Sequence, residues 1–169
     1  MTSDLAGYRD YVAAHLDPLR RTAYLLCGDW HTADDLVSTA LVRLLRHWRR
    51  VSTIDNLDAY VRRILLRTWL NERRRPWRRE APFASIPDRG GGTGPDGVPD
   101  RLAIIALLAE LPPRRRAVLV LRYVCDLSVV DTAAALGCST GTVKSQTARA
   151  LDVLRARLLS AAPIEGNLR

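Results

Sequence analysis

The sequence predicts an all-α protein made of two small helical domains joined by a flexible linker. Apolar residues recur at spacings of three and four in both halves of the chain, and no segment alternates apolar and polar residues as a strand does. Residues 80–100 contain four prolines and five glycines, a mixture that neither helices nor strands tolerate. Such a segment is too long for a loop inside one compact domain. We therefore expect a first domain, a linker, a second domain and a tail at residues 1–79, 80–100, 101–160 and 161–169.

Four helices are expected in the first domain. The first apolar stripe ends where Asp17-Pro18 offers an N-cap with proline at the first helical position, and this pair predicts a second helix that reaches about Cys27. A capping box at Thr32–Asp35 starts the third helix. The apolar stripe of that helix consists of Leu36, Val37, Ala40, Leu41, Leu44, Leu45 and Trp48.

The fourth helix is expected to begin near Asp55 or Asn56 and to end at Pro76. Most of the net positive charge lies here: Val61–Arg79 has eight arginines and one glutamate, so this stretch carries 8 − 1 = +7 of the formal net charge of +8. Arginine pairs with phosphate in a bidentate way, so this charge indicates a polyanionic partner. Trp69 and Trp77 lie among the arginines and could either stack on bases or pack in a core. Spacings of four, four and three place one set of polar residues on a single exposed face: Arg63, Arg67, Asn71 and Arg74.

The second domain has the anatomy of a helix-turn-helix. A first helix follows Asp100, and the sequence LPPRRR ends it and starts the next at Pro113. Ser128 caps a short helix, Gly137 allows a left-handed turn, and a long helix follows from about residue 140 to 159. Its inward stripe is predicted to be Val143, Thr147, Leu151, Leu154 and Leu158. The residues off that stripe that suit base edges and phosphates are Thr142, Lys144, Ser145, Gln146 and Arg149.

The same sequence argues against several other classes of protein. No apolar run is long enough for a transmembrane helix, and no signal peptide is evident, so we expect a cytoplasmic protein. The three histidines have no partnered nucleophile, which argues against an enzyme. Cys27 and His31 could share a metal, but no third and fourth ligands are evident, so we expect small buried residues and neither metal nor cofactor. Three widely spaced cysteines do not indicate a disulfide framework.

Three segments carry a family resemblance. The segment ELPPRRRAVLVLRYVCDLSVVDTAAALGCSTGTVKSQTARALDVLR resembles region 4 of the extracytoplasmic-function (ECF) sigma factors of bacterial RNA polymerase. AYLLCGDWHTADDLVSTALVRLLRHW resembles their region 2.1–2.2, and DAYVRRILLRTWLNERRR resembles their region 2.3–2.4. The match covers both domains in order and is similar in particular to the actinobacterial SigE-like group of the sigma-70 family.

The resemblance implies a promoter-specificity subunit. In the family, region 2 binds the clamp helices of the polymerase β′ subunit and opens the −10 element, while region 4 reads the −35 element and docks on the β flap. The five residues named above on the last helix would then contact the −35 duplex. An anti-sigma factor is a common regulator in the family. The residues implied to contact the −10 element are Ser52, Thr53, Asp55, Asn56, Arg63, Arg67, Asn71 and Arg74. Those implied to bind core polymerase are Asp34, Asp35, Ser38, Thr39, Val42 and Arg46.

Three positions depart from the family pattern. Arg67 stands where close relatives usually carry asparagine, Ser38 where they carry glutamine, and Asp131 where glutamate is common. Two alternative functions remain open from the residues alone. One is an autonomous helix-turn-helix transcriptional regulator, which would have no need of the arginine face in the first domain. The other is a helical adaptor whose basic surface meets an acidic protein.

Overall fold

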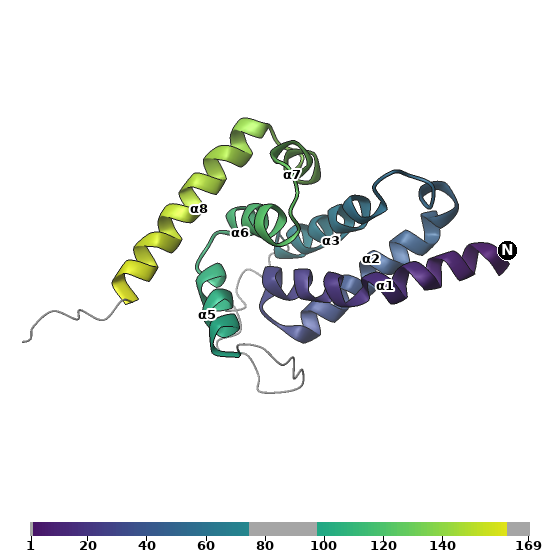
Figure 1. Cartoon of the computed structure of the whole chain (residues 1–169), viewed down its shortest axis with the longest axis horizontal. Helices are drawn as coiled ribbons and strands as arrows, with labels where there is room; N and C mark the ends of the chain where they lie inside the picture. Colours follow the sequence, from purple (N-terminus) through teal and green to yellow (C-terminus); the bar gives the residue numbers. More distant parts are fainter. Residues whose placement is uncertain (1, 75–97, 162–169) are drawn as a thin grey trace, which may run out of the picture.

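A computed structural model of the chain describes residues 2–74 and 98–161, with side chains for residues 5–74 and 102–160. Every regular element in these ranges is helical, as the sequence predicts (Figure 1). The first domain consists of α1 (Thr2–Cys27), α2 (Trp30–Val51) and α3 (Leu57–Arg74). The second consists of α5 (Val98–Ala109), α6 (Pro113–Leu119), the π-helical turn η1 (Val120–Val124), α7 (Val129–Leu136) and α8 (Thr140–Ala161).

The N-terminal segment differs from the prediction of two helices. A single helix, α1, runs through Asp17 and Pro18 without ending. Pro18 removes one backbone hydrogen bond, but both halves of α1 pack against the rest of the domain. Tyr8 Oη donates to the backbone oxygen of Leu41 at 3.1 Å in the first half, and Leu19 is buried in the second. Tertiary packing therefore outweighs the local signal to stop.

The starts of α2 and α3 are fixed by side-chain caps. Asp29 caps α2, since its carboxylate accepts a hydrogen bond from the Thr32 backbone N–H at 2.7 Å. The predicted capping box at Thr32–Asp35 is therefore wrong by about one turn. Asn56 Oδ1 accepts from the Ala59 backbone N–H at 2.9 Å, close to the predicted start of the fourth helix. The predicted end at Pro76 lies outside the described residues, as does Trp77.

The helix-turn-helix forms as its sequence predicts. Ser128 Oγ accepts from the Asp131 backbone N–H at 3.0 Å and caps α7. Gly137 ends α7 with φ of 64°, a left-handed conformation that favours glycine. Ser139 Oγ then accepts from the Thr142 backbone N–H at 3.1 Å at the start of α8. α7 and α8 are held together by a small cluster of Val118, Ala133 and Val143.

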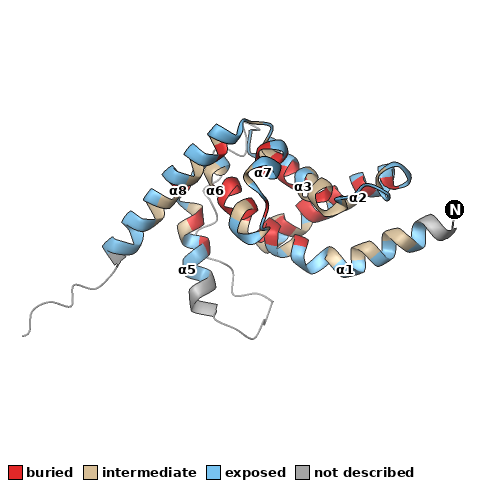
Figure 2. Ribbon diagram, turned by 45° about the horizontal axis from the view of Figure 1, so that its top comes forward, coloured by how far each residue is buried: buried red, intermediate tan, exposed pale blue. Residues whose placement is uncertain are grey.

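One buried core spans both domains, which the sequence did not predict. Buried residues concentrate between α1, α2 and α3 and where α1 and α3 meet α6 (Figure 2). The second domain lies against the bundle, with α7 and α6 on α3 and with α5 and η1 on α1. Residues 75–97, which contain most of the predicted linker, lie outside the described residues. The two domains that the sequence predicts are therefore packed together in this structure.

Two leucines predicted to face inward are exposed. Leu158 lies near the end of α8, which projects beyond the body of the protein (Figure 1), and its side chain is 58% exposed. Leu45 on α2 is 44% exposed. Both leucines sit at the margin of a helical stripe, where spacing alone does not say how far the neighbouring helix reaches. Trp69, by contrast, is 2% exposed, so the core-packing interpretation of this residue is confirmed.

Candidate nucleic-acid interface

The start of α8 presents its polar residues to solvent. Lys144, Ser145 and Arg149 are exposed, while Thr142 and Gln146 are half-buried. Two of the five predicted residues already have side-chain partners. The Thr142 hydroxyl lies 2.9 Å from Ser139 Oγ, and Gln146 Oε1 accepts from Arg115 Nε at 3.2 Å. Of the five residues, the two basic ones, Lys144 and Arg149, are therefore both open to solvent, and Ser145 donates only to the Thr142 backbone oxygen at 3.0 Å.

The arginine face of α3 is exposed along its whole length. Arg63, Arg67, Asn71 and Arg74 all lie on the solvent side. The opposite side packs Val61, Leu65, Leu66 and Trp69 into the core. Because the core fixes one side of the helix, the arginines cannot turn inward, and the face is held as a row of positive charge.

The loop between α2 and α3 is exposed, but not all of its predicted residues are equally available. Ser52, Thr53 and Asp55 lie on the surface. The Asn56 side chain caps α3, so its amide oxygen is already engaged. Ile54, which the sequence analysis did not single out, is 38% exposed at the tip of this loop and adds an apolar surface there.

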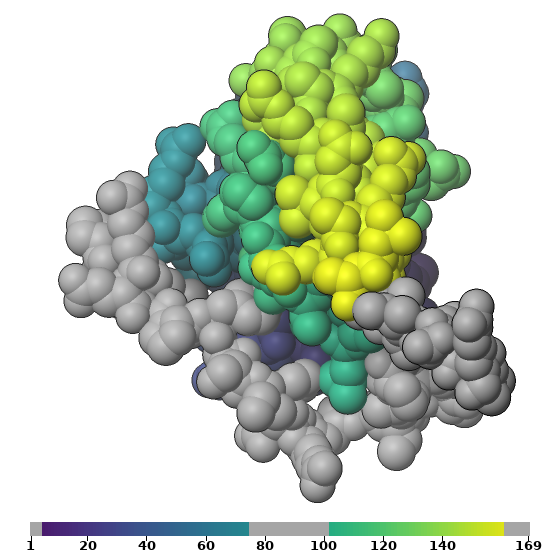
Figure 3. All heavy atoms as spheres, turned by 90° about the vertical axis from the view of Figure 1, so that its left-hand side faces the viewer, coloured from purple at the N-terminus to yellow at the C-terminus, as the bar shows by residue number. Residues whose placement is uncertain are grey.

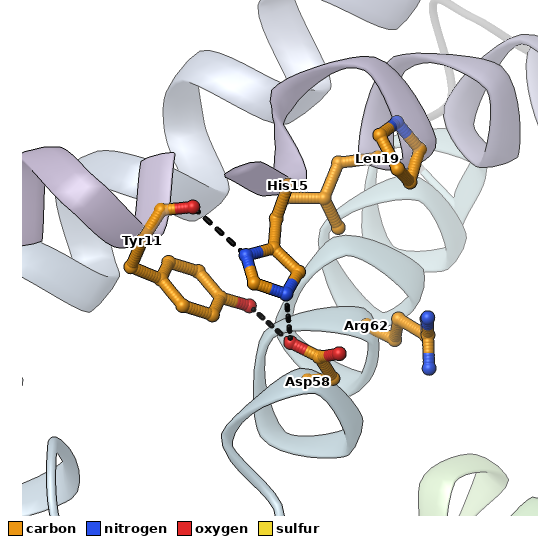
Figure 4. Close-up of a pocket in the computed structure, with 6 residues that line it drawn as sticks. Tyr11, His15, Leu19, Asp58 and Arg62 are labelled. Carbon is orange, nitrogen blue, oxygen red and sulfur yellow. Dashed lines mark hydrogen bonds and ion pairs between the residues drawn. The ribbon is translucent and has the colours of Figure 1, made fainter. Parts of the chain in front are cut away.

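A polar cluster joins α1 to the first turn of α3, next to this loop (Figure 4). Tyr11 Oη donates to Asp58 Oδ1 at 2.9 Å, and His15 Nε2 lies 3.2 Å from the same oxygen. The Tyr11 and His15 rings stack with centroids 4.2 Å apart. Burial, followed by the hydrogen bond to Asp58, raises the pKa of Tyr11 above its ordinary value. The cavity beside them is only about 10 Å³, so the cluster positions the first turn of α3 and leaves no room for a ligand.

On α2, the residues expected to meet core polymerase are mostly exposed. Asp35, Ser38, Val42 and Arg46 are exposed and Thr39 is half-buried. Asp34 differs, because its carboxylate pairs with Arg20 at 2.5 and 3.1 Å and so helps to hold α2 against α1. Val42, as expected for this face, is 49% exposed, and Leu45, which the sequence analysis assigned to the core, is 44% exposed beside it and adds to its apolar surface.

The junction of the two domains is organised by Arg116, a residue that sequence analysis did not distinguish from its neighbours. Its side chain is 2% exposed. Nη1 donates to the backbone oxygen of Leu26 at 2.7 Å, and Nη2 donates to those of Ala109 at 2.9 Å and Leu111 at 3.3 Å. The guanidinium also lies 5.8 Å from the centre of the Trp69 ring. Burial, and then repulsion by Arg73, lower the pKa of Arg116 to about 10, so the group stays charged at neutral pH.

Neither a cluster of metal ligands nor a membrane-spanning helix is found among the described residues. No three His, Cys, Asp or Glu side chains within the described ranges gather as metal ligands. Cys27 Sγ donates to the Asp29 backbone oxygen at 3.1 Å, and burial raises its thiol pKa to about 11, which disfavours the thiolate that would bind metal. Of the helices in these ranges, none has the length and apolar character needed to span a membrane.

Both domains of the chain match known protein families. The chain matches the family described as Sigma-70 region 2 over residues 11–79 and Sigma-70, region 4 over residues 101–154. It is 38% identical to the RNA polymerase sigma-E factor of Streptomyces avermitilis, covering 93% of this chain and 88% of that one. It is 33% identical to the ECF RNA polymerase sigma factor EcfG of Rhodopseudomonas palustris, over 89% of this chain and 84% of that one.

Solved structures show the same fold. The sigma factor RpoE from Bartonella quintana, in complex with the anti-sigma factor NepR, superposes with a TM-score of 0.75 at 24% identity, covering 92% of this chain and 98% of that one. CnrH, in complex with the cytosolic domain of CnrY, gives a TM-score of 0.64 at 22% identity, with 92% and 89% covered.

The helix-turn-helix, the bundle with its arginine face and these matches together define a transcription initiation factor of bacterial RNA polymerase, and the chain belongs to the sigma-70 family. Within that family it is an ECF sigma factor, as the sequence resemblance implies.

Removing the charge at the junction should weaken the whole structure. Arg116→Met keeps the aliphatic length but leaves three backbone oxygens without their donor, and each of the two buried ones, those of Leu26 and Leu111, costs about 1–3 kcal/mol when unsatisfied. We expect the free energy of unfolding in urea to fall by about 2–6 kcal/mol, and the radius of gyration by small-angle scattering to rise as the domains separate. Arg114→Met, at an exposed neighbour, is the matched control and should change neither. An unstable Arg116→Met protein that stays compact would show that Arg116 acts only within the second domain.

Proposed function

We propose that this sigma factor directs core RNA polymerase to promoters by reading the −35 duplex with α8 and opening the −10 element with α3 and the preceding loop. The observation that carries the proposal is the row of exposed arginines on α3, whose opposite side is locked into the core. Positive charge along a rigid helix beside an exposed loop suits the backbone and unstacked bases of a melting strand. An autonomous helix-turn-helix regulator would have no use for this second basic surface.

Core polymerase is the proposed partner of α2. The face around Val42, Leu45 and Arg46 combines exposed apolar side chains with charge at its edge, the composition of a protein interface. The sigma factor itself would perform no chemistry, and it would act in the cytoplasm, where polymerase and DNA are found. An anti-sigma factor is a further proposed partner, supported by the solved sigma factor RpoE, which has a similar fold and was crystallised with the anti-sigma factor NepR.

The packed arrangement must open before both promoter elements can be read. Arg74 of the −10 surface and Gln146 of the −35 surface line one and the same groove in this structure. The two elements are named from positions about 25 base pairs apart, roughly 85 Å along a duplex at about 3.4 Å per base pair. One groove cannot contact both, so we infer that the structure is the closed form of the sigma factor and that polymerase binding separates the domains.

The direct test is transcription by reconstituted polymerase. With core enzyme and a library of genomic fragments, the full chain should produce discrete run-off transcripts that are absent without it. If the chain binds DNA sites alone but yields no transcripts with core enzyme, the autonomous regulator is the better description. Binding to core enzyme without any promoter-dependent transcript would favour the helical adaptor.

Arg149 tests the reading of the −35 element. If its guanidinium makes a bidentate contact with a base, Arg149→Ala should weaken binding of the holoenzyme to the preferred −35 sequence by about 1–3 kcal/mol. It should also reduce discrimination at one base pair. Arg155→Ala, further along the same helix and exposed, serves as the control for charge. An equal loss on every −35 variant would make Arg149 a phosphate contact.

Arg67 tests how the −10 element is held. Asparagine, usual in relatives, offers a donor and an acceptor, whereas arginine offers donors only. Since Arg67 lies one turn from Arg63 and Asn71 on the charged face, we expect a phosphate contact. Arg67→Asn should then lower open-complex formation, keep the ranking of −10 sequences, and flatten the log–log salt slope by about 0.7 to 0.9. A reordered ranking with an unaltered slope would show that Arg67 reads a base.

A further inference from the structure

A basic groove lies where three helices from the two domains meet. Its volume is about 360 Å³, within the range of small-molecule sites. Figure 3 views the molecule from the side on which the end of α3, the start of α6 and α8 come together. The residues that line the groove are Leu70, Arg73 and Arg74 from α3, Pro112, Pro113, Arg114 and Arg115 at the start of α6, and Gln146 from α8.

The four arginines of this groove lack acidic partners among the described residues. No carboxylate within the described ranges forms an ion pair with Arg73, Arg74 or Arg114. Arg115 donates to a neutral acceptor, Gln146 Oε1. A fifth guanidinium, that of the buried Arg116, is close enough to Arg73 for the two positive charges to repel each other. Like charges gathered in this way repel one another, so a bound anion would stabilise the groove.

The chemistry of the residues that line the groove indicates which class of anion it can bind. Guanidinium groups match phosphate oxygens with two parallel hydrogen bonds, and arginines from two helices can follow a run of linked phosphates. Leu70, Pro112 and Pro113 add an apolar wall on which a flat ring can lie. The groove therefore combines charged and apolar lining residues, as a nucleotide combines phosphates with an apolar ring.

We propose that this groove binds a nucleotide-sized oligophosphate whose phosphates pair with Arg73 and Arg74 of one domain and Arg114 and Arg115 of the other. Because its contacts come from both domains, the ligand holds the closed form together. Arg74 and Gln146 also belong to the surfaces proposed for DNA, so ligand and promoter compete for them. The binding site itself depends only on the packed groove and is tested without DNA or polymerase.

The experiment is calorimetric titration of the full chain with inorganic tripolyphosphate, with ATP and with hexaglutamate. Arg73→Ala/Arg114→Ala removes one guanidinium from each domain. Arg9→Ala/Arg155→Ala removes the same charge from exposed sites outside the groove. We expect one phosphate ligand per chain, an affinity about tenfold or more lower in the groove variant, and a change within about twofold in the control. Circular dichroism melts check that both variants are folded.

The three ligands distinguish a nucleotide site from a site for phosphates alone and from a site for an acidic peptide. ATP binding more tightly than tripolyphosphate identifies a nucleotide site, and equal affinity identifies a site for phosphates alone. An equal loss in both double variants would mean diffuse attraction to a basic protein and would overturn the proposal. So would hexaglutamate binding as tightly as tripolyphosphate through the same arginines, since this would indicate an acidic peptide site. Small-angle scattering gives an independent measure: a ligand that increases the radius of gyration would contradict its role in holding the closed form.

Discussion

A single buried cation constrains the arrangement of this protein. A guanidinium removed from water destabilises a fold by several kcal/mol unless its donors are satisfied. Arg116 finds its acceptors at the last turns of α1 and α5, where helix carbonyls lack partners and the helix dipole is negative. Trp69 of α3 lies beneath it. Three helices that are distant in sequence must therefore meet at one point, and α6, which carries Arg116, is fixed against all of them.

The positions of the functional surfaces follow from this junction and from the core around it. On α3, the buried residues Val61, Leu65 and Trp69 leave the arginines only the outer side. The same packing brings the end of α3 beside the start of α6, and so brings arginines from both domains into one groove. The closed form thus holds together the two surfaces that promoter binding must separate. The junction between the domains is therefore the place where promoter binding can be controlled.

The sequence was informative at several places where structure depends on near neighbours, although the capping box at Thr32–Asp35 was misplaced. Helical spacing, the Ser128 cap and Gly137 predicted the helix-turn-helix, and the spacing from Arg63 to Arg74 predicted an exposed face. It was misleading where distant packing decides: α1 continues through Pro18, and Leu45 and Leu158 face solvent. Arg114, Arg115 and Arg116 are identical in type and adjacent, yet they are exposed, half-buried and buried respectively, because each step along a helix turns the side chain by about 100°. Arg116 could have been identified as the buried arginine only from the positions of the helices that pack against α6.

The contact between Arg116 and Leu26 joins residues 90 positions apart, and this separation has a consequence for the nascent chain. Translation proceeds at about 5–20 residues per second, and domains fold in the order in which they emerge from the ribosome. The end of α3, Arg74, is made 116 − 74 = 42 residues before Arg116, so the first domain is complete roughly 2–8 s before the residue that closes it has been synthesised. During that interval the carbonyl groups at the end of α1 are open to water and the sides of α1 and α3 that later pack against the second domain are uncovered. Each newly made molecule thus passes through an open state before its first closure.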